Sequence, residues 1–595
     1  MSADAWVTSA TVVAIFVALV ANLAPVDLLF IAGAAFLAAY GVITPAEAFA
    51  GFSNPGVLTV AVLFVVAAAL RETGVLDHVG QRVLGRAGNT RGATSRLAAV
   101  VVPSSAFLNN TPIVAMFVPT VLDWCRRHRV LPSKLLIPLS FFAILGGTCT
   151  LIGTSTNLVV NGLMIQEKMP SMGLFEIGLV GLPCAVVGFL YLYFFGPRLL
   201  PDRKGFLEQL TETRREYLAE MKVEPGCRLI GQTVEGAGLR HLTGLFLIEI
   251  NRGETILSPV GPEDRIEADD NLVFTGVLSN IIELERIAGL VPAVDPSYEV
   301  SPSKQRGRRL CEVVISESSP LIGKTVRGAD FRAAFGAAVV AVHRGGARIK
   351  QKVGDIVLRP GDTLLLQVGP HFLRAYRNDP AFYLISAVDD WRPLRRDRAW
   401  IALALLGVLV VVMTAGWLPA VVVATLAAVL MVGFGCISPG DARRSVEYQV
   451  IVTIAAAFAI GTALQNSGVV GLLASELVAA TQGYGPEWGP YISLAAVYLI
   501  VSVLTAMITN NAAAILMFPL CLETAQLYGV SPQPFFIVLM LAASASFMTP
   551  IGYQTNMLVY GAGGYRFTDF LKIGAPLSLL LWIVAIVLVP WFWSF

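Results

Sequence analysis

A long apolar segment with a polar centre, residues 97–125, constrains this chain more than any other feature of its sequence. Its length suffices to cross a bilayer once, because about 20 apolar residues span the hydrocarbon core. A single crossing would place one of its basic flanks outside the cell, whereas lysine and arginine stay on the cytoplasmic side. The flanks are Arg82, Arg86, Arg91 and Arg96 before the segment and Arg126, Arg127, Arg129 and Lys134 after it. We therefore expect a re-entrant hairpin with Asn109-Asn110-Thr111 at its tip, and such a tip is tolerated at membrane depth only inside protein or along a cavity.

The composition indicates a polytopic membrane protein with a soluble insert. Of the 595 residues, 55% are hydrophobic and 14% are charged, against roughly 25% charged residues in soluble proteins. No lysine or arginine precedes Arg71, none lies between Arg444 and Arg566, and charge is concentrated in residues 198–398. The predicted parts are a membrane repeat in residues 1–200, an insert in residues 201–394 and a second membrane repeat in residues 395–595.

The membrane parts are predicted to be helical, with two interruptions. Apolar stretches are found at 8–23, 25–40, 52–70, 133–161, 175–196, 400–415, 418–434, 448–464, 491–521, 535–549 and 577–593. We expect the stretch at 491–521 to be a second hairpin, because Asn510-Asn511 lies in its middle. Glycine pairs and hydroxyl residues at 146–157 and 549–556 are expected to break helices at membrane depth and to free backbone carbonyl groups.

The two membrane halves repeat each other. Asn109-Asn110-Thr111 matches Thr509-Asn510-Asn511 at an offset of 400 residues, and Thr156-Asn157 matches Thr555-Asn556 at an offset of 399. Each half then holds five spanning helices and one re-entrant hairpin. Five is odd and the insert keeps both inner ends on the cytoplasmic side, so the halves are predicted to have opposite orientations. The predicted fold is a polytopic α-helical inverted repeat, typical of secondary transporters, with an α/β cytoplasmic insert.

Four polar elements are predicted to converge on one site for an anion and a cation. Helix N-termini present free N–H groups to an anion, and unwound carbonyls with Asn, Ser and Thr oxygens suit Na⁺. No basic or acidic residue lies near these elements in the sequence, and Glu72, Glu447 and Glu476 are expected at the membrane interface, so sodium coupling is favoured over proton coupling. The predicted substrate-binding residues are Asn109, Asn110, Thr111, Ser155, Thr156, Asn157, Thr509, Asn510, Asn511, Thr555 and Asn556.

The insert contains a repeat of its own, at an offset of 92 residues. Leu229-Ile230-Gly231-Gln232-Thr233-Val234 matches Leu321-Ile322-Gly323-Lys324-Thr325-Val326. Apolar alternation predicts strands, at 245–250, 271–275, 338–342 and 363–368. The copies, in residues 201–300 and 301–394, resemble the TrkA-C (RCK-C) domain, a small α/β regulatory module. This resemblance implies either a small regulatory ligand or a structural, dimerising role. The exposed polar candidates for a ligand are Arg240, Arg332 and His343.

The tips and broken helices resemble the signatures of the divalent anion:sodium symporters. That family carries Ser-Asn-Thr at its tips, where this chain has Asn109 and Thr509 in place of Ser and Asn511 in place of Thr. The resemblance implies a homodimer, an elevator mechanism, and two Na⁺ sites with the substrate between them. The Na⁺-site candidates are Asn110, Gly153, Asn510 and Gly552. Members with TrkA-C inserts look like sulfate permeases, so sulfate is the favoured anion.

Three other transport functions stay open. A Na⁺/dicarboxylate symporter and an exporter of arsenite or another oxyanion share the general fold, and the direction and ion dependence of transport would distinguish them. TrkA-C domains also regulate K⁺ flux, so a K⁺ transport protein is a less favoured alternative. An enzyme is not expected, because the sequence has no Ser/His/Asp, metal-ligand or Walker pattern. We expect the chain in the inner (plasma) membrane, in contact with lipid and with no nucleic acid.

Overall fold

A computed structural model shows two compact parts, which we call unit 1 and unit 2. Unit 1 comprises Met1–Asp202, Pro393–Val559 and Phe567–Phe595, and unit 2 comprises Arg203–Arg392 and Tyr560–Arg566. The described residues are 2–20, 23–75, 87–203, 218–239, 245–253, 255–257, 260–276, 284, 287–292, 309–316, 319–344, 347–349, 351, 353–368, 372, 376, 379, 381–387, 395–483, 485, 487–550 and 552–595. Arg82, Arg86 and Arg240 lie outside the described residues, as does the side chain of Arg332.

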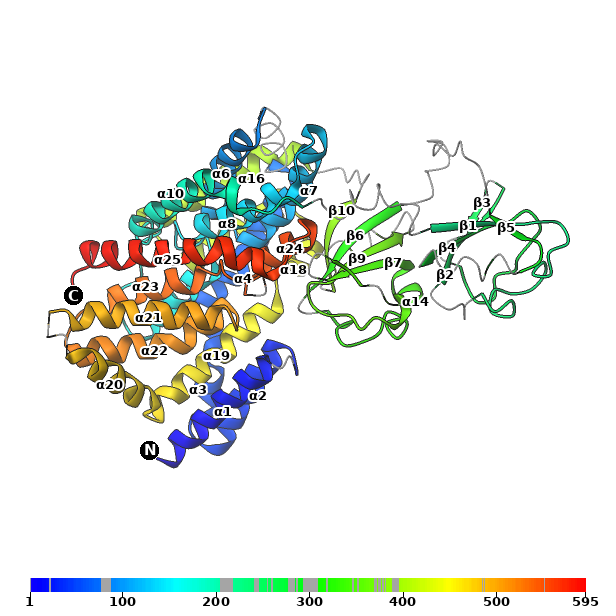
Figure 1. Ribbon diagram of the computed structural model, residues 1–595. Helices are drawn as coiled ribbons and strands as arrows, with labels where there is room; N and C mark the ends of the chain where they lie inside the picture. Colours follow the sequence, from blue (N-terminus) through cyan, green and yellow to red (C-terminus); the bar gives the residue numbers. More distant parts are fainter. Residues whose placement is uncertain are drawn as a thin grey trace. The chain divides into compact units, whose positions relative to one another are not determined.

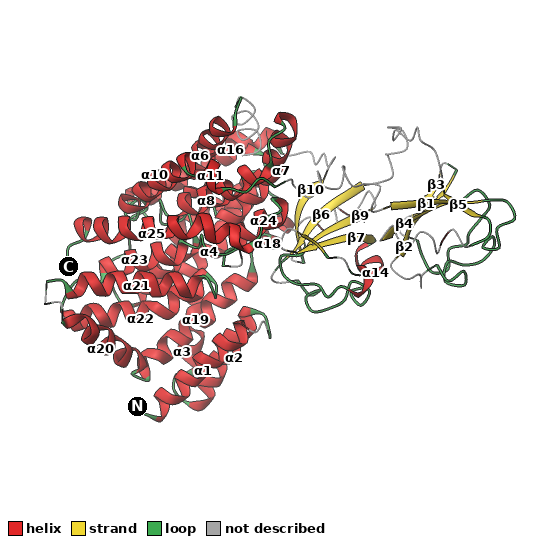
Figure 2. Cartoon of the chain, viewed as in Figure 1, coloured by secondary structure: helices red, strands yellow, loops and turns green. Residues whose placement is uncertain are grey.

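Unit 1 is helical, as Figure 1 and Figure 2 show. The helices of its first half are α1 (Ala3–Val20), α2 (Val26–Tyr40), α3 (Pro45–Phe49), α4 (Pro55–Glu72), α6 (Thr90–Phe107), α7 (Asn110–His128), α8 (Leu136–Gly147), α9 (Ser155–Gln166), α10 (Gly178–Phe194) and α11 (Gly196–Leu199). Those of its second half are α16 (Ala399–Ala415), α17 (Ala420–Gly433), α18 (Pro439–Arg444), α19 (Tyr448–Asn466), α20 (Val469–Gln482), α21 (Gly489–Thr505), α22 (Asn510–Tyr528), α23 (Gln533–Ser544), α24 (Gln554–Ala562) and α25 (Phe567–Phe592).

The short helices α3 and α18 begin in the same way, 394 residues apart. The hydroxyl of Thr44 accepts a hydrogen bond from the Glu47 N–H, and that of Ser438 accepts one from the Asp441 N–H. Such side-chain caps satisfy an N–H group that has no partner within the helix. A proline follows each cap, and its fixed φ suits the first helical position. The correspondence between the halves therefore extends from the hairpins to α3 and α18, which precede them.

Each predicted hairpin is a pair of helices joined by a short turn. In the first, α6 ends at Phe107 and α7 begins at Asn110; in the second, α21 ends at Thr505 and α22 begins at Asn510. Arg126 and Arg127 belong to the last turn of α7, which ends before Arg129 in the left-handed conformation, with φ 53°. Cations at a helix C-terminus interact favourably with its partial negative charge.

The two predicted interruptions are present, with one correction. The helical stretch stops at Gly147 and resumes at Ser155, and in the second half it stops at Ser544 and resumes at Gln554. Residues 155–157 and 555–556 are predicted to lie within the unwound stretches, but they form the first turns of α9 and α24. The physical reason is that hydroxyl and amide side chains favour helix N-termini. Such residues therefore occur at the start of the helix that follows a break as well as in the break.

Two further helices differ from the prediction. α25 begins ten residues before the predicted 577, so it also contains Lys572. Asp569 in its first turn complements the partial positive charge of that end. α20 is absent from the prediction because its 14 residues are too few to span a bilayer. The described helical stretches that are long and apolar enough to cross a membrane are Pro45–Glu72, Arg396–Ala415, Tyr448–Asn466 and Phe567–Phe592, with shorter apolar helices beside them.

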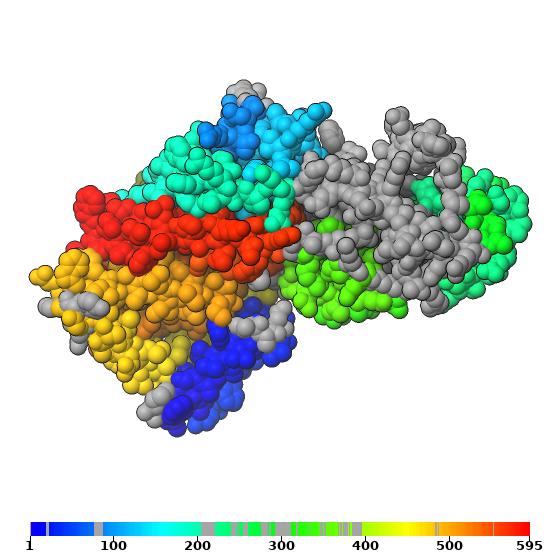
Figure 3. Space-filling view, in the orientation of Figure 1, coloured from blue at the N-terminus to red at the C-terminus, as the bar shows by residue number. Residues whose placement is uncertain are grey.

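Aromatic side chains fill the core of unit 1. Phe518 of α22 stacks on Phe536 of α23, with ring centroids 4.5 Å apart, and Phe141 of α8 meets Phe547 edge-to-face at 4.9 Å. The second pair joins the two halves of the chain beside the second interruption. α25 packs against α10 and α21, and on the face shown in Figure 3 it lies between them. Both interruptions thus lie among packed helices, where their freed backbone groups can be satisfied by protein.

Unit 2 contains two antiparallel sheets with the same strand order. The first sheet runs β3-β2-β4-β1-β5 and the second runs β8-β7-β9-β6-β10. The strands of the first are β1 (Leu218–Val223), β2 (Leu245–Arg252), β3 (Thr255–Leu257), β4 (Asn271–Gly276) and β5 (Leu290–Pro292). Those of the second are β6 (Arg309–Ile315), β7 (Ala337–Arg344), β8 (Ala347–Arg348), β9 (Thr363–Val368) and β10 (Phe382–Ala387), with the short helix α14 (Phe331–Phe335) before β7. The four predicted strands are confirmed as β2, β4, β7 and β9.

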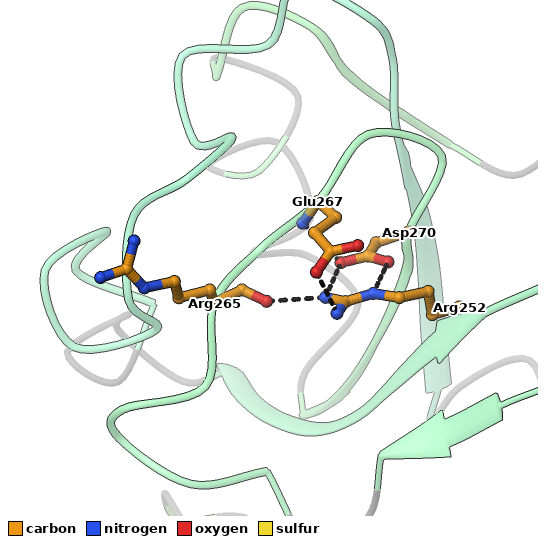
Figure 4. Close-up of polar contacts among 4 residues, drawn as sticks. All are labelled: Arg252, Arg265, Glu267 and Asp270. Carbon is orange, nitrogen blue, oxygen red and sulfur yellow. Dashed lines mark hydrogen bonds and ion pairs between the residues drawn. The ribbon is translucent and has the colours of Figure 1, made fainter.

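The insert repeat also holds at the level of single hydrogen bonds. Arg252 donates from Nε and Nη2 to the two carboxylate oxygens of Asp270, both at 2.9 Å, and to the Arg265 carbonyl (Figure 4). Arg344 binds Asp362 in the same way, at 2.7 Å for both bonds. Each carboxylate is fully buried. The prediction that His343 is exposed is wrong: it is 7% exposed, because every residue of β7 before Arg344 is buried.

Candidate ion and anion site

The tip of the first hairpin is anchored by a buried amide. The Ser105 Oγ of α6 lies 2.6 Å from Asn110 Oδ1 and 2.7 Å from the carbonyl oxygen of Ala143 in α8, within hydrogen-bonding distance of both. Asn110 is 1% exposed, and its amide lies against Gly147, the last residue of α8: a Cβ placed on this glycine would lie 2.5 Å from Asn110 Oδ1. The absence of a side chain at Gly147 therefore lets the tip reach the start of the interruption.

The second hairpin repeats this arrangement. The Thr505 Oγ1 of α21 lies 2.6 Å from Asn510 Oδ1 and 2.9 Å from the carbonyl oxygen of Ala543 in α23, within hydrogen-bonding distance of both. Donors and acceptors all lie 400 residues after those of the first hairpin. Sequence reasoning selected Asn110 and Asn510 but missed Ser105 and Thr505. Their common offset is a signal that could have found them.

A buried asparagine at the end of each interruption donates hydrogen bonds to backbone carbonyl groups within it. Asn157 donates through Nδ2 to the Thr150 carbonyl at 3.0 Å, and Asn556 donates to the Thr549 carbonyl at 3.0 Å and to the Ser546 carbonyl at 2.7 Å. These bonds satisfy carbonyl groups that the interruption has freed from helical pairing. The unwound backbone is thereby held in one conformation at each predicted site.

Oxygen atoms crowd around the two predicted glycines. A Cβ on Gly153 would lie 2.6 Å from the Gly147 carbonyl oxygen and 2.9 Å from that of Ser105. A Cβ on Gly552 would lie 2.5 Å from Ser546 Oγ and 2.9 Å from both the Thr505 carbonyl and Thr549 Oγ1. We call these groups cluster 1 and cluster 2. Neutral carbonyl and hydroxyl oxygens suit a hard cation such as Na⁺, and the described residues contain no group of three His, Cys, Asp or Glu side chains able to hold a metal ion.

Side chains from the two halves meet directly at two places. At the first, which we call junction 1, Asn110 Nδ2 donates to the Tyr553 hydroxyl at 2.7 Å and Thr111 Oγ1 donates to Gln554 Oε1 at 3.1 Å. Junction 1 joins the tip of the first hairpin to the start of α24. Tyr553 and Gln554 were not predicted, because no sequence motif distinguishes them from the neighbouring residues of the interruption.

At the second place, junction 2, the second hairpin meets the start of α9. Asn511 Oδ1 accepts from Ser155 Oγ at 3.2 Å and from Thr156 Oγ1 at 3.0 Å. Beside junction 1, Ser140 of α8 donates to Asn556 Oδ1 at 2.7 Å, and its Oγ lies 2.9 Å from Thr555 Oγ1. The structure therefore brings the four predicted polar elements into side-chain contact in two pairs, and their binding of ions remains a prediction.

The remaining two predicted residues, Asn109 and Thr509, cap helices. Asn109 precedes α7 without a side-chain capping bond, and Thr509 precedes α22 with its hydroxyl accepting from the Ala512 N–H at 3.4 Å. Both are half-buried, unlike Asn110 and Asn510 behind them. They stand at the N-termini that would face an anion.

Glu447, expected at the membrane interface, immediately precedes α19. Burial raises the pKa of Glu447 to about 7, and the nearby Arg71 guanidinium offsets part of that effect.

Comparisons with known proteins agree with a transport site. The model of the citrate transporter family, CitMHS, matches residues 10–542. The chain is 37% identical to a putative sulfur deprivation response regulator of Chlamydomonas reinhardtii, over 95% of this chain and 97% of that protein. It is 34% identical to an uncharacterized transporter of Synechocystis, over 96% and 95% of the two chains. It is 28% identical to probable sodium/sulfate cotransporter 3 of Chlamydomonas reinhardtii, over 98% and 88%. This chain therefore belongs to the citrate transporter (CitMHS) family and is a multi-pass membrane transporter.

Proposed function

We propose that this protein is a Na⁺-coupled transporter of a divalent oxyanion, with sulfate as the favoured substrate. The observation that carries the proposal is the pair of oxygen clusters around Gly153 and Gly552, which share the carbonyl of the residue that bonds each hairpin-tip asparagine, Ser105 or Thr505. Two clusters of neutral oxygens would give two cation sites, in which two monovalent cations offset the charge of one dianion. The candidate Na⁺ ligands are the carbonyl or side-chain oxygens around Asn110, Gly153, Asn510 and Gly552.

Cluster 2 supports the cation assignment through a buried hydroxyl. Ser546 is 3% exposed, and its Oγ has no hydrogen-bond partner among the described residues. A buried polar atom without a partner costs free energy, and a bound cation would remove that cost. The names of the relatives, sodium/sulfate cotransporters among them, support Na⁺ over H⁺.

The anion would bind between the two hairpins, close to four helix N-termini. α7, α9 and α22 begin at predicted site residues, and α24 begins one residue before Thr555. Helix N-termini present N–H donors and a partial positive charge. No lysine or arginine bonds to the tip side chains in the described part of the chain. A dianion whose charge is balanced by N–H dipoles and co-bound Na⁺ fits this arrangement.

The transport cycle proposed here is an elevator in an inverted-repeat homodimer. Basic residues flank the first hairpin, whereas the second, Gly489–Tyr528, has neither lysine nor arginine within it or beside it; this asymmetry supports opposite orientations in the membrane. The insert would then be cytoplasmic, and its two copies would act as TrkA-C-like domains that bind a small ligand or join protomers. A Na⁺/dicarboxylate symporter and an oxyanion exporter are the alternatives.

Uptake by proteoliposomes containing the full chain tests this function. Sulfate, succinate, citrate, phosphate and arsenite are offered with an inward Na⁺ gradient and with K⁺ in its place. We expect sulfate uptake that needs Na⁺ and that falls at least 100-fold in Asn110→Ala and in Asn510→Ala. Thr414→Val, which removes an exposed hydroxyl that bonds only within α16, is the matched control and should transport like the wild type. Sulfate uptake that is equal in Na⁺ and K⁺ would contradict the coupling, and normal uptake in both Asn variants would contradict the site.

A further inference from the structure

The helices α9 and α24, whose first turns carry site residues, contain equivalent glycines. The offset of 399 residues that matches Asn157 with Asn556 also matches Gly162 with Gly561, five residues further along each chain segment. Five residues of α-helix rise by about 7.5 Å. Each glycine therefore lies within the same rigid element as the polar start of its helix, and whatever holds the glycine also holds the site residues.

In the first half, the glycine is held by an amide of the membrane part. Asn54, which caps α4 and is 6% exposed, donates through Nδ2 to the Gly162 carbonyl at 3.1 Å. A Cβ placed on Gly162 would overlap Asn54 Oδ1 and would lie 3.2 Å from the Gly56 Cα. We call the contact of Asn54 with Gly162 clamp 1. It fixes α9 against the start of α4.

In the second half, the equivalent glycine is held by the insert. Residues Tyr560–Arg566, which include the last turn of α24, belong to unit 2 together with the two sheets. The three atoms nearest to a Cβ placed on Gly561 all come from the second sheet: such a Cβ would overlap Thr363 Oγ1 and would lie 3.3 Å from Val314 Cγ2 and 3.5 Å from Thr363 Cβ. We call the contact of Thr363 with Gly561 clamp 2. A strand of the insert thus has the place that Asn54 has in the first half.

The two copies of the insert differ at the position of clamp 2. Val314 and Thr363 are partners on β6 and β9 and are buried, and their chain neighbours belong to the core of the sheet, so both side chains lie on the opposite face. The offset of 92 residues places Lys222 and Asn271 there in the first copy, and these are also strand partners. The Lys222 side chain is 47% exposed and pairs with Asp269 at 2.9 Å. The face that holds a glycine in the second copy is therefore charged in the first.

We propose that the second copy of the insert positions the transport site through α24, with Thr363 and Gly561 as positioning residues and not ligands. α24 has nine residues, and at its start Gln554 accepts from Thr111 and Asn556 accepts from Ser140. A shift of β9 against Gly561 moves these two side chains with the helix. The inference rests on the proposed function and deepens it, because it makes the insert a regulator of this site.

Compensating substitutions across clamp 2 test this role. Gly561→Ala adds a methyl group that overlaps the Thr363 hydroxyl, and Thr363→Ala removes this hydroxyl and leaves the new Cβ 3.5 Å from the Thr363 Cβ. Initial rates of Na⁺-dependent sulfate uptake by proteoliposomes should show a KM raised about tenfold in Gly561→Ala, with Vmax changed less than about threefold. The double variant should have a KM within about threefold of the wild type. Asn271→Ala, the equivalent change in the first copy, is the matched control and should not rescue Gly561→Ala.

Protection of the insert by substrate measures the same coupling from the other side, because coupling between two sites is reciprocal. The purified full chain is digested at increasing urea concentration, with and without sodium sulfate. Sulfate with Na⁺ should raise the urea concentration needed to cleave residues 309–387 and should leave that for residues 218–292 unchanged. Gly561→Ala should lose this shift. The measurement on the wild type needs no variant, so it decides the question even if Gly561→Ala does not fold.

The outcomes separate the inference from the function on which it rests. A KM that stays raised in the double variant, or that Asn271→Ala restores equally well, would overturn the positioning role, while sulfate uptake by the wild type would leave the proposed function intact. Equal protection of both copies by sulfate, or protection of neither, would also overturn it. If the wild type takes up no anion of the panel in Na⁺, the proposed function fails, and the inference fails with it.

Discussion

The insert and the membrane part each contain two similar copies, but they differ in which hydrogen bonds are the same in both copies. In the insert, the Arg252–Asp270 and Arg344–Asp362 pairs are made within each copy and are identical in form. In the membrane part, the bonds within each half are also kept, as those of Ser105 and Thr505 show. The hydrogen bonds between the halves differ, because different residues make them at junction 1 and at junction 2.

This difference indicates where evolution of a duplicated chain can create a directional site. A bond within one copy holds that copy's own fold, so losing it in either copy costs stability. A bond between copies can differ on its two sides, as the bond of Asn110 to Tyr553 at junction 1 and that of Asn511 to Thr156 at junction 2 show. We therefore expect different residues at the two junctions. We expect similar residues at Ser105 and Thr505, which anchor the hairpins, and at the glycines Gly153 and Gly552.

The glycines give the largest expected effect and test the symmetry. Gly153→Ala and Gly552→Ala should each lower Na⁺-dependent sulfate uptake at least 100-fold, because the added Cβ would lie 2.6 Å or less from an oxygen of its cluster. Gly407→Ala in α16, where a Cβ meets nothing within 4 Å, is the control and should keep uptake. Uptake lost in only one of the two cluster variants would show that the clusters are unequal in function.

The buried ion pairs of the insert give the next effect. Asp270→Ala and Asp362→Ala should each destabilise their own sheet by about 3 kcal/mol, because each leaves an arginine without its buried partner. Urea-dependent limited proteolysis of the full chain measures this effect. Asp355→Ala, which removes the exposed partner of Arg327, should change stability by less than about 1 kcal/mol. If only one of the two variants were destabilised, the two ion pairs would contribute unequally to the stability of their sheets.

Much of the fold could be predicted from local sequence. The hairpins, the interruptions and four strands follow from apolar length, from turn residues and from alternation, all of which act over a few neighbouring residues. The early start of α25 and the presence of α20 could not be predicted in this way, because a helix packed among others need not be long or uniformly apolar. The burial of His343 likewise depends on what covers β7, which no local pattern records.

The site residues that occur in both halves could be predicted from the sequence, whereas those that occur in one half could not. Asn110 and Asn510 are visible in the sequence because their motif occurs twice. Tyr553, Gln554 and Ser140 bond to residues more than 400 positions away, and the sequence contains no second copy of them to compare. The raised pKa of Glu447 also depends on packing, since the position of this residue before α19 predicts only a helix end.

Glu447 offers the smallest and most specific test, because its counterpart differs in chemistry. Asn54 precedes α4 as Glu447 precedes α19, and its neutral amide caps the helix and bonds the Gly162 carbonyl. The pKa of Glu447 is raised from 4.5 to about 7, so between these pH values the folded protein binds more protons than the unfolded chain. Its contribution to stability is full below pH 4.5 and is lost as the pH rises through 7, at up to about 1.4 kcal/mol per pH unit. Melting temperatures from pH 5 to 8 should therefore fall more for the wild type than for Glu447→Gln, with Glu476→Gln on the exposed face of α20 as the control. Parallel profiles for wild type and Glu447→Gln would show that this carboxyl titrates in the same way in the folded and unfolded chain.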